Sequence, residues 1–200
     1  MAEVGKNRDP LCVRFVNTVD WRDDPGRRVD NLASYSDLVL WARDAAAITP
    51  STAAKLIREA NRAPADSQTA FSHAMAVRES IASVLSAAAF KKEPIDADLQ
   101  LVNAALAECG RHLNIGSGSG RFHYTWDSDD HLDRVLWPIV RSAGDLLTSP
   151  VVERLRLCEG EGCGWFFMDN TRNRSRRWCN MAVCGNRAKV KRFYERHRLQ

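Results

Sequence analysis

Long hydrophobic runs are absent from this 200-residue sequence, and so is the pattern of a secretion signal. No segment approaches the roughly 18 consecutive apolar residues that a membrane-spanning helix needs. The first ten residues, MAEVGKNRDP, lack the order of basic, apolar and small residues that marks a signal peptide. These absences predict a cytoplasmic protein that has no membrane partner and works in a reducing compartment, where disulfides are rare.

Familiar catalytic motifs are missing as well. The chain has no G-x-S-x-G, no P-loop and no H-E-x-x-H sequence, and its five histidines show no metal-ligand spacing. The glycine-rich stretch 116–120, GSGSG, does not stand between a strand and a helix, as a dinucleotide-binding loop does. We expect a flexible break there, and we expect no catalytic residues and no enzymatic activity.

Charge is distributed unevenly over the chain. Residues 151–200 carry 12 Lys and Arg against 5 Asp and Glu, a net charge of +7, whereas residues 1–150 carry 17 against 20, a net charge of −3. Hydrophobic residues make up 44% of the sequence, enough for the core of one domain with a small appendage. A basic end on a mildly acidic body predicts an anionic partner for that end alone.

Periodic apolar residues predict a fold that is mainly α with small β elements. We expect a helical N-terminal domain over residues 1–150, joined at Ser149-Pro150 to a small module over residues 151–200. The expected helices cover about 34–47, 49–61, 64–93, 96–109 and 131–147, the last one kinked or restarted at Pro138, and a short strand is expected over 121–126.

Local signals mark the start of two helices and leave one segment open. Ser34 followed by Asp37 resembles a capping box, and Thr49 before Pro50 offers a capping residue followed by a proline at the first helical position. Residues 11–21, LCVRFVNTVDW, are apolar enough to be buried. Their periodicity does not distinguish a short strand from a helical turn.

Six cysteines in a reducing compartment indicate metal binding or free thiols before disulfides. Four of them, Cys158, Cys163, Cys179 and Cys184, have the spacing C-x4-C-x15-C-x4-C. Two close pairs separated by a hairpin-length stretch are the usual way to assemble a four-thiolate zinc site, and four thiolates leave no open position for water. The sequence therefore predicts one structural Zn²⁺. The two remaining cysteines are expected to be small buried hydrophobes.

The module around the cysteines predicts a treble-clef-like zinc finger, built from a β-hairpin and a helix. The glycines within residues 159–162 allow a tight turn between the first two cysteines. We expect one strand over 164–169, a turn over 170–173, a returning strand over 175–178 and a helix from Cys184 onward. The inner face of that helix is expected to consist of Val190, Phe193, Tyr194 and His197.

The tetrapeptide CGNR at residues 184–187 is the signature of the CGNR zinc finger family, and residues 163–198 resemble that family throughout. Residues 1–150 are similar to the ABATE domain that usually precedes this finger, through FVNTV at 15–19 and through Arg78. The resemblance implies a stress-linked bacterial transcription regulator with a DNA-binding finger and a ligand-binding body.

Basic side chains crowd the module, and guanidinium groups match the geometry of phosphates. The expected nucleic-acid contacts are Arg172, Arg174, Arg176, Arg177, Arg187, Lys189, Lys191 and Arg192. Arg187 is the weaker candidate, because it could instead cap the zinc site or pair with Asp169 or Glu195. The alternative interpretation is a solvated basic surface that keeps a small module soluble. Charge alone does not separate DNA from RNA.

A regulator needs an input site, and a polar interruption in an apolar segment is the best candidate for one. Asn17 and Thr18 form such an interruption, and Arg78 on the long third helix could face it and hold an anionic small molecule. The alternative is that Asn17 and Thr18 cap a helix or turn and that Arg78 pairs with Glu79 or Asp44.

Together with the family resemblance, these features predict a bacterial transcription regulator. Its expected partners are duplex DNA, an unidentified small-molecule ligand and a second copy of the chain, because a single finger gives limited specificity. The alternative is a small-molecule-binding or enzymatic body whose finger contacts RNA or protein. Binding of duplex DNA that weakens steeply with salt distinguishes the two.

Overall fold

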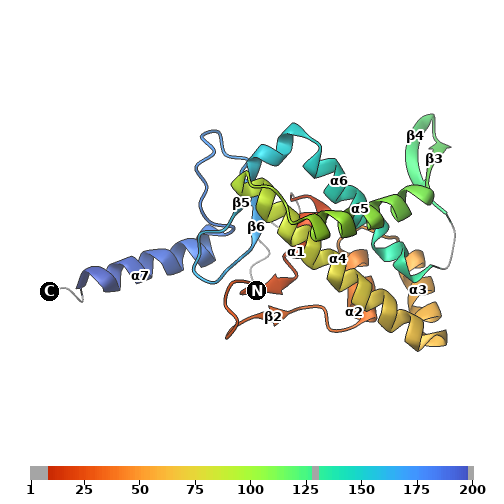
Figure 1. The fold of residues 1–200 in the computed structure, drawn as a ribbon, viewed down its shortest axis with the longest axis horizontal. Coiled ribbons are helices and arrows are strands. Elements are labelled where there is room, and N and C mark those ends of the chain that lie inside the picture. The colour runs from red at the N-terminus through yellow and green to blue at the C-terminus, as the bar shows by residue number, and fades with distance from the viewer. Residues whose placement is uncertain (1–8, 128–130, 198–200) are drawn as a thin grey trace.

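The computed structural model describes residues 9–127 and 131–197. Most of the chain forms a bundle of helices, and a small module at the C-terminal end continues into a helix that projects from the bundle (Figure 1). The helices of the bundle are α1 (Leu11–Val16), α2 (Tyr35–Asp44), α3 (Pro50–Arg62), α4 (Pro64–Phe90), α5 (Asp96–Arg111) and α6 (Trp137–Leu147). The prediction of a mainly α fold with small β elements is confirmed.

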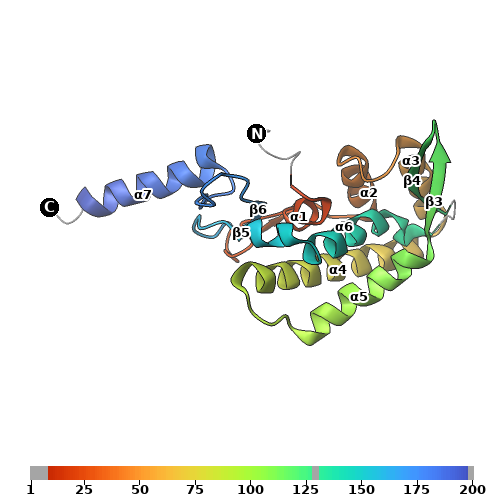
Figure 2. The same ribbon diagram turned by 90° about the horizontal axis from the view of Figure 1, so that it is seen from above.

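The long helix α4 is the central element of the bundle. It contacts α1, α2, α3, α5 and α6 along its 27 residues (Figure 2). Ala74, Val77, Ile81 and Leu85 are completely buried, as the sequence spacing indicates. Side chains spaced three or four residues apart share one helix face, so this stripe faces the other helices, and its burial stabilises the whole helix.

Side chains cap the starts of α2 and α3 as predicted. The Ser34 hydroxyl accepts a hydrogen bond from the Asp37 amide (3.1 Å), and the Asp37 carboxylate accepts one from the Ala33 amide in return. The Thr49 hydroxyl accepts one from the Thr52 amide (3.1 Å), with Pro50 at the first helical position. These contacts satisfy backbone donors that a helix start otherwise leaves unpaired.

The predicted interruption at Pro138 is also confirmed. A 3₁₀ turn covers Leu132–Val135, and α6 starts again at Trp137 with the proline in its first turn. A proline has no backbone N–H to donate, and the first turn of a helix is where that group has no intrahelical partner.

The predicted flexible break at residues 116–120 is wrong. Strand β3 (Leu113–Gly118) pairs antiparallel with β4 (Arg121–Trp126), and the two form a hairpin that stands out from the bundle (Figure 1). Ser119 and Gly120 form the turn, and both have a positive φ (51° and 73°). Two-residue hairpin turns need this left-handed backbone, which glycine adopts without strain.

Residues 11–21 contain both structures that their sequence left open. The helix α1 covers Leu11–Val16, and strand β1 (Val19–Asp20) follows and pairs with β2 (Val29–Asp30). The loop between β1 and β2 begins at Trp21, which has a positive φ of 54°. This loop leads away from the bundle towards the C-terminal module.

The hairpin of the C-terminal module uses a different first strand from the predicted one. Strand β6 (Phe166–Met168) pairs with β5 (Leu155–Leu157), which precedes the first cysteine, with Leu155 opposite Met168. Residues 175–178 form no strand. The glycine-rich loop between Cys158 and Cys163 closes the hairpin, so the chain turns before β6 and not after it.

A buried carboxylate organises the loop that replaces the predicted returning strand. Asp169 is completely buried and accepts hydrogen bonds from the Thr171 amide (3.0 Å), the Thr171 hydroxyl (2.6 Å) and the Arg176 amide (2.9 Å). Charged groups are buried only when such partners are present. These bonds fold residues 169–176 back upon themselves.

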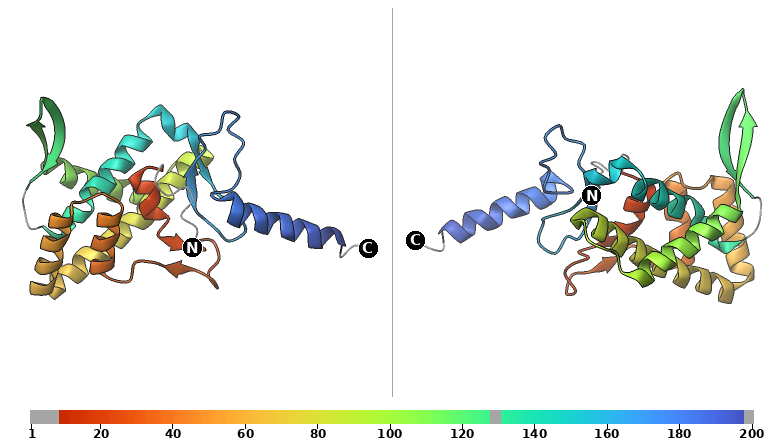
Figure 3. Two further views of the ribbon diagram at one scale, coloured as in Figure 1. Left: turned by 180° about the vertical axis from the view of Figure 1, so that it is seen from behind. Right: turned by 45° about the horizontal axis from the view of Figure 1, so that its top comes forward.

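The last helix, α7 (Asn186–His197), follows a π-helical turn (Met181–Gly185) and projects away from the bundle (Figure 3). Its predicted inner face is exposed: Val190, Phe193 and Tyr194 are 54%, 51% and 63% accessible. That prediction is wrong because the hairpin against which the helix was expected to pack is turned towards the bundle. The helix packs mainly on the turn that precedes it.

The module and the bundle share one hydrophobic core across the predicted joint at Ser149-Pro150. Leu155, Phe166 and Met168 of the hairpin belong to the same buried cluster as the side chains of α1 and α4. None of the helices in the described part of the chain has both the length and the apolar content for crossing a membrane.

Candidate metal centre and nucleic-acid surface

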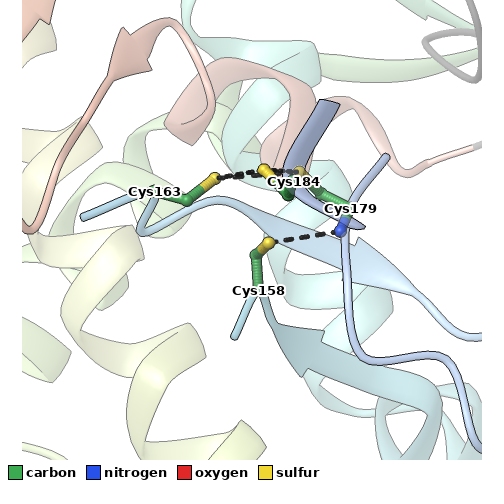
Figure 4. Close-up of side chains that lie close together, drawn as sticks. All are labelled: Cys158, Cys163, Cys179 and Cys184. Atoms are coloured by element: carbon green, nitrogen blue, oxygen red, sulfur yellow. Dashed lines mark hydrogen bonds between the residues drawn. The ribbon is translucent and has the colours of Figure 1, made fainter. Parts of the chain in front are cut away.

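The four predicted cysteine ligands converge on one point (Figure 4). Cys158 and Cys163 lie in the loop between β5 and β6, Cys179 lies in the loop after β6, and Cys184 lies in the turn before α7. All four Sγ atoms lie within 4.8 Å of one another. The distances are 3.7 Å from Cys163 to Cys179, 3.7 Å from Cys179 to Cys184 and 3.6 Å from Cys184 to Cys163. A tetrahedral zinc site with Zn–S bonds of about 2.3 Å has S···S edges of about 3.8 Å, whereas a disulfide needs about 2.05 Å.

Local backbone structure aims each sulfur at this point. Cys158 directly follows β5, and its Sγ accepts hydrogen bonds from the amides of Gly160 (3.4 Å) and Cys179 (3.3 Å). Cys184 lies in the turn before α7. A Cβ atom on Gly160 would lie only 3.0 Å from the Cys184 Cβ, so the loop needs glycine at this position.

The thiols influence one another strongly. Hydrogen bonds from Cys163 and Cys179 lower the pKa of Cys158 to about 2, and the resulting thiolate raises the pKa of Cys163 to about 12 and that of Cys179 as well. One thiolate therefore opposes the ionisation of its neighbours, and four thiolates coexist only around a cation.

The donor set fits a single structural Zn²⁺. Four sulfurs at tetrahedral spacing complete the preferred coordination of zinc and leave no position for a reacting water. Cys158, Cys163, Cys179 and Cys184 would hold the ion, which would fix the positions of β5, β6, the 169–180 loop and α7 relative to one another. The cofactor prediction is confirmed at the level of its ligands.

The zinc-binding loop is pressed against the loop that connects β1 and β2. Gly162 and Gly164 both have a positive φ, and a Cβ on Gly164 would lie 2.6 Å from the Arg22 Cβ. The Arg22 amide donates to the Cys163 carbonyl (3.2 Å). These glycines therefore allow the finger to pack closely against the bundle, and they also allow the tight turns within the finger.

Asn17 forms the closest polar link between the bundle and the finger. Its amide nitrogen donates to the Phe166 carbonyl (2.7 Å), and its amide oxygen accepts from the Phe166 backbone N–H (2.9 Å). The Trp165 indole N–H donates to the Val19 carbonyl (2.9 Å) close by. Asn17 thus pairs with the edge of β6 as a neighbouring strand would.

The other two predicted ligand-binding residues, Thr18 and Arg78, contact each other within the bundle. Arg78 is 98% buried, and its Nη1 donates to Asp30 (2.8 Å) and Thr18 (3.0 Å). Its Nη2 donates to Asp30 (2.5 Å), and its Nε donates to Glu79 (3.0 Å). The guanidinium therefore directs its donors at the protein itself, and Thr18 caps α1 through the Phe15 carbonyl (2.8 Å).

These contacts answer the alternatives left open for the three residues. The predicted pairing of Arg78 with Glu79 is confirmed, whereas Asp44 pairs with Arg43 (2.8 Å). Thr18 and Arg78 touch, but Asn17 faces the finger. Binding of a small ligand at these residues stays a prediction.

The eight predicted nucleic-acid contacts differ in what they touch. Three form ion pairs with glutamates at the surface: Arg174 with Glu153 (3.5 Å), Arg177 with Glu159 (2.5 Å) and Lys191 with Glu161 (2.8 Å). Arg172, Lys189 and Arg192 are exposed, and none of them has an acidic partner within residues 9–127 and 131–197. Surface ion pairs of this kind contribute roughly 0–1 kcal/mol, so a phosphate could replace the glutamates.

Arg176 has a role within the finger. Its guanidinium lies over the Phe167 ring, 4.6 Å from the centroid, and donates to the carbonyls of Trp178 and Cys179. These contacts hold the chain that leads into the third zinc ligand. Arg176 is therefore less available to a phosphate than the sequence indicates.

Arg187, the arginine of the CGNR tetrapeptide, connects the zinc site to the bundle. It donates to Cys184 Sγ (3.2 Å), and its guanidinium lies 4.1 Å from the centroid of the Trp21 ring. A positive charge beside a thiolate stabilises it, and a cation over an indole is attracted by the ring. The suggested pairing with Asp169 or Glu195 is wrong, and the suggested contact with the zinc site is right.

Comparison with protein families agrees with this geometry. Residues 9–150 match the ABATE family, described as "Putative stress-induced transcription regulator", and residues 154–197 match the CGNR zinc finger. The chain belongs to the ABATE family. No curated protein matches its sequence. The two matched segments meet close to the predicted joint of the ABATE body and the CGNR finger.

The contact between the ABATE body and the finger is the part of the site that sequence reasoning missed. Trp21, Arg22 and Asp30 have no motif around them, and their partners lie far away along the chain. The glycines at 162 and 164 were the available signal, but a glycine does not reveal what approaches it.

We expect one zinc ion per chain, measured by elemental analysis of the purified full-length protein. Cys184→Ser should abolish metal binding and lower the thermal midpoint of the whole chain, because β5 and β6 share the core of the bundle. Structural zinc contributes on the order of 10–16 kcal/mol in finger peptides. Cys109→Ala, at a buried cysteine outside the cluster, should retain the zinc. An unchanged midpoint after chelation would contradict the assignment.

Gly164→Ala should destabilise the protein by roughly 1–3 kcal/mol, because it adds a Cβ that collides with Arg22 at a left-handed position. Gly110→Ala is the matched control. Gly110 lies within α5 with nothing close to its added Cβ, so alanine should stabilise by up to about 1 kcal/mol there. Urea unfolding measures both changes, and equal effects would rule out close docking at Gly164.

Stability should fall in acid through the Arg78 cluster. Burial opposes ionisation of Asp30 and Glu79, but Arg78 and Arg22 outweigh it and lower the pKa of both carboxyls. Groups with a lowered pKa stabilise the fold above their unfolded pKa of about 4, and this contribution is lost as the pH falls through the folded value. Arg78→Met should therefore cost roughly 2–3 kcal/mol at pH 7 and less towards pH 3.

The control for that comparison is Arg43→Met, whose partner Asp44 is 68% exposed. Its effect should stay near zero at every pH. Unfolding free energies measured between pH 3 and pH 7 test both variants, and a pH-independent loss in Arg78→Met would show that the ion cluster is not responsible.

Proposed function

We propose that the chain is a non-catalytic transcription regulator, whose CGNR finger binds duplex DNA and whose ABATE body senses a small ligand. The observation that carries this proposal is a set of cations on a zinc-fixed scaffold. Arg172, Lys189 and Arg192 are exposed without acidic partners in the described part of the chain. Cations placed in this way neutralise phosphates and release counterions.

Two further predicted contacts, Arg177 and Lys191, are also available to a phosphate, although both form ion pairs. Arg177 and Lys191 are paired with glutamates that are 49% and 71% exposed. Exchanging a solvated carboxylate for a DNA phosphate loses little free energy. Glu159 and Glu161 would then compete only weakly with DNA for these two cations.

The joint between body and finger gives such a regulator a route from input to output. Arg78 binds Thr18, just before β1, and Asp30, in β2, whereas Asn17 and Val19 bind the finger. A ligand that displaces β1 or the loop after it would therefore shift the finger. Coupling requires this kind of contiguous, differentially stabilised element.

We also propose that two chains act together on DNA, because one small module neutralises few phosphates. A thermal-shift screen of the full-length protein against small anions tests the input, since any ligand raises the thermal midpoint by mass action.

Binding to a mixed-sequence DNA duplex should weaken steeply with salt. The slope of log K against log salt is negative, and each lost phosphate contact decreases its magnitude by about 0.9. Arg172→Ala and Lys189→Ala should therefore each make the slope shallower by roughly one. Fluorescence anisotropy across a salt series measures the slopes. Arg43→Ala, on the bundle, is the control and should change nothing. Absence of duplex binding at low salt would refute the proposal.

A further inference from the structure

The outward stripe of α7 combines exposed aromatic and apolar side chains. Val190, Phe193 and Tyr194 are each more than half exposed, and the two aromatic residues lie three and four positions after Val190, on one face of the helix. The Phe193 ring contacts the His197 ring (4.1 Å between centroids) and the Tyr194 ring (5.8 Å). Clustered apolar exposure of this kind marks a binding surface.

A neighbouring stripe on α7, made of Arg187 and Lys191, determines how the aromatic stripe is oriented. Arg187 reaches back to Cys184, and Lys191, one turn later, pairs with Glu161 of the zinc-binding loop. These two residues bind α7 to the finger. The aromatic stripe lies beside them on the helix and is exposed. The helix itself projects from the bundle (Figures 1 and 3).

Cations line the other edge of the aromatic stripe. Lys189, Arg192 and Arg196 occur at helical spacing, and none of them pairs with an acid among the described residues. The Nε atoms of the two arginines donate only to carbonyls of their own helix. Over its whole length α7 carries five Lys and Arg against a single Glu195.

The positive charge of α7 determines which kind of partner can bind the aromatic stripe. A second copy of α7 would bring five further cations against the first five, so self-association through this face is opposed by like-charge repulsion. An anionic membrane would also attract the cations, but the apolar stripe of α7 offers only Val190, Phe193 and Tyr194 for insertion among lipids. A nucleic acid satisfies the cations with phosphates and the rings with bases.

We propose that the aromatic stripe of α7 stacks on unpaired DNA bases, so that the chain binds locally opened DNA more tightly than a closed duplex. Bases inside a closed duplex hide their faces in the stack, and only opened strands offer them to Phe193 and Tyr194. Lys189, Arg192 and Arg196 contact the phosphates alongside. The inference rests on the proposed function and specifies the form of DNA that the same finger recognises.

The test compares three DNA probes with full-length protein carrying zinc: a duplex, the same duplex with a central mismatched bubble, and the single strand. The wild type should bind the bubble and the single strand at least about tenfold more tightly than the duplex, the range that stacking on one or two aromatics provides. Phe193→Ala combined with Tyr194→Ala should abolish this preference and leave duplex affinity unchanged.

Phe122→Ala is the matched control, because Phe122 is an exposed aromatic (82%) on the β3–β4 hairpin, away from the finger. It should keep the preference. Zinc content and circular dichroism of the double variant check that it remains folded. Lys189→Ala should weaken binding to all three probes alike.

Four results would overturn the inference. Equal affinity for all probes, or an unchanged preference in the double variant, would show that the rings do not stack on bases. A wild-type dimer that the double variant dissociates in light scattering would assign the stripe to a second copy. If the double variant lost binding to phosphatidylglycerol vesicles but kept its preference for opened DNA, the aromatic stripe would be assigned to lipid. No binding to any probe at low salt would instead refute the proposed function itself.

Discussion

Mutual repulsion among four thiolates is the constraint on which the C-terminal module depends. The sulfurs of Cys163, Cys179 and Cys184 lie 3.6–3.7 Å apart, and ionisation of Cys158 already raises the pKa of its neighbours. Only a divalent cation makes this arrangement favourable. Once it is bound, the metal fixes the loop of the β5–β6 hairpin, the loop after it and the start of α7 around a small cluster that includes Phe167 and Trp165.

The finger is nevertheless more than a metal-stabilised appendage. Its hairpin contributes Leu155, Phe166 and Met168 to the core of the bundle, and Asn17 bonds to the edge of β6. Thr18, just before β1, and Asp30, at the end of β2, both bind the buried guanidinium of Arg78 in α4. The two family segments are therefore joined by a shared hydrophobic core and by hydrogen bonds at Asn17 and at the β1 strand.

Several features of the fold were predictable because their causes are local. The caps at Ser34 and Thr49, the restart at Pro138 and the apolar stripe of α4 depend on residues a few positions apart. The turn at Ser119-Gly120 was as local, but its glycines favour a left-handed turn as well as a flexible break, and the pairing of Leu113 with Trp126 decided between them. The predicted inner face of α7 is wrong for a different reason. Its apolar side chains have the spacing of an inner face, but the hairpin that would cover them packs against the bundle.

The sequence by itself determined the metal site, because the number and spacing of the cysteines leave one coordination chemistry open to them. It also determined that the finger is basic and that the body is helical. The tertiary structure alone decided which strand pairs with β6, which basic residues are free and which hold the finger together, and where Asn17 and Arg78 point. Those outcomes depend on contacts such as Arg78 with Asp30 and Arg187 with Trp21, 48 and 166 positions apart, for which the chain carries no local signal.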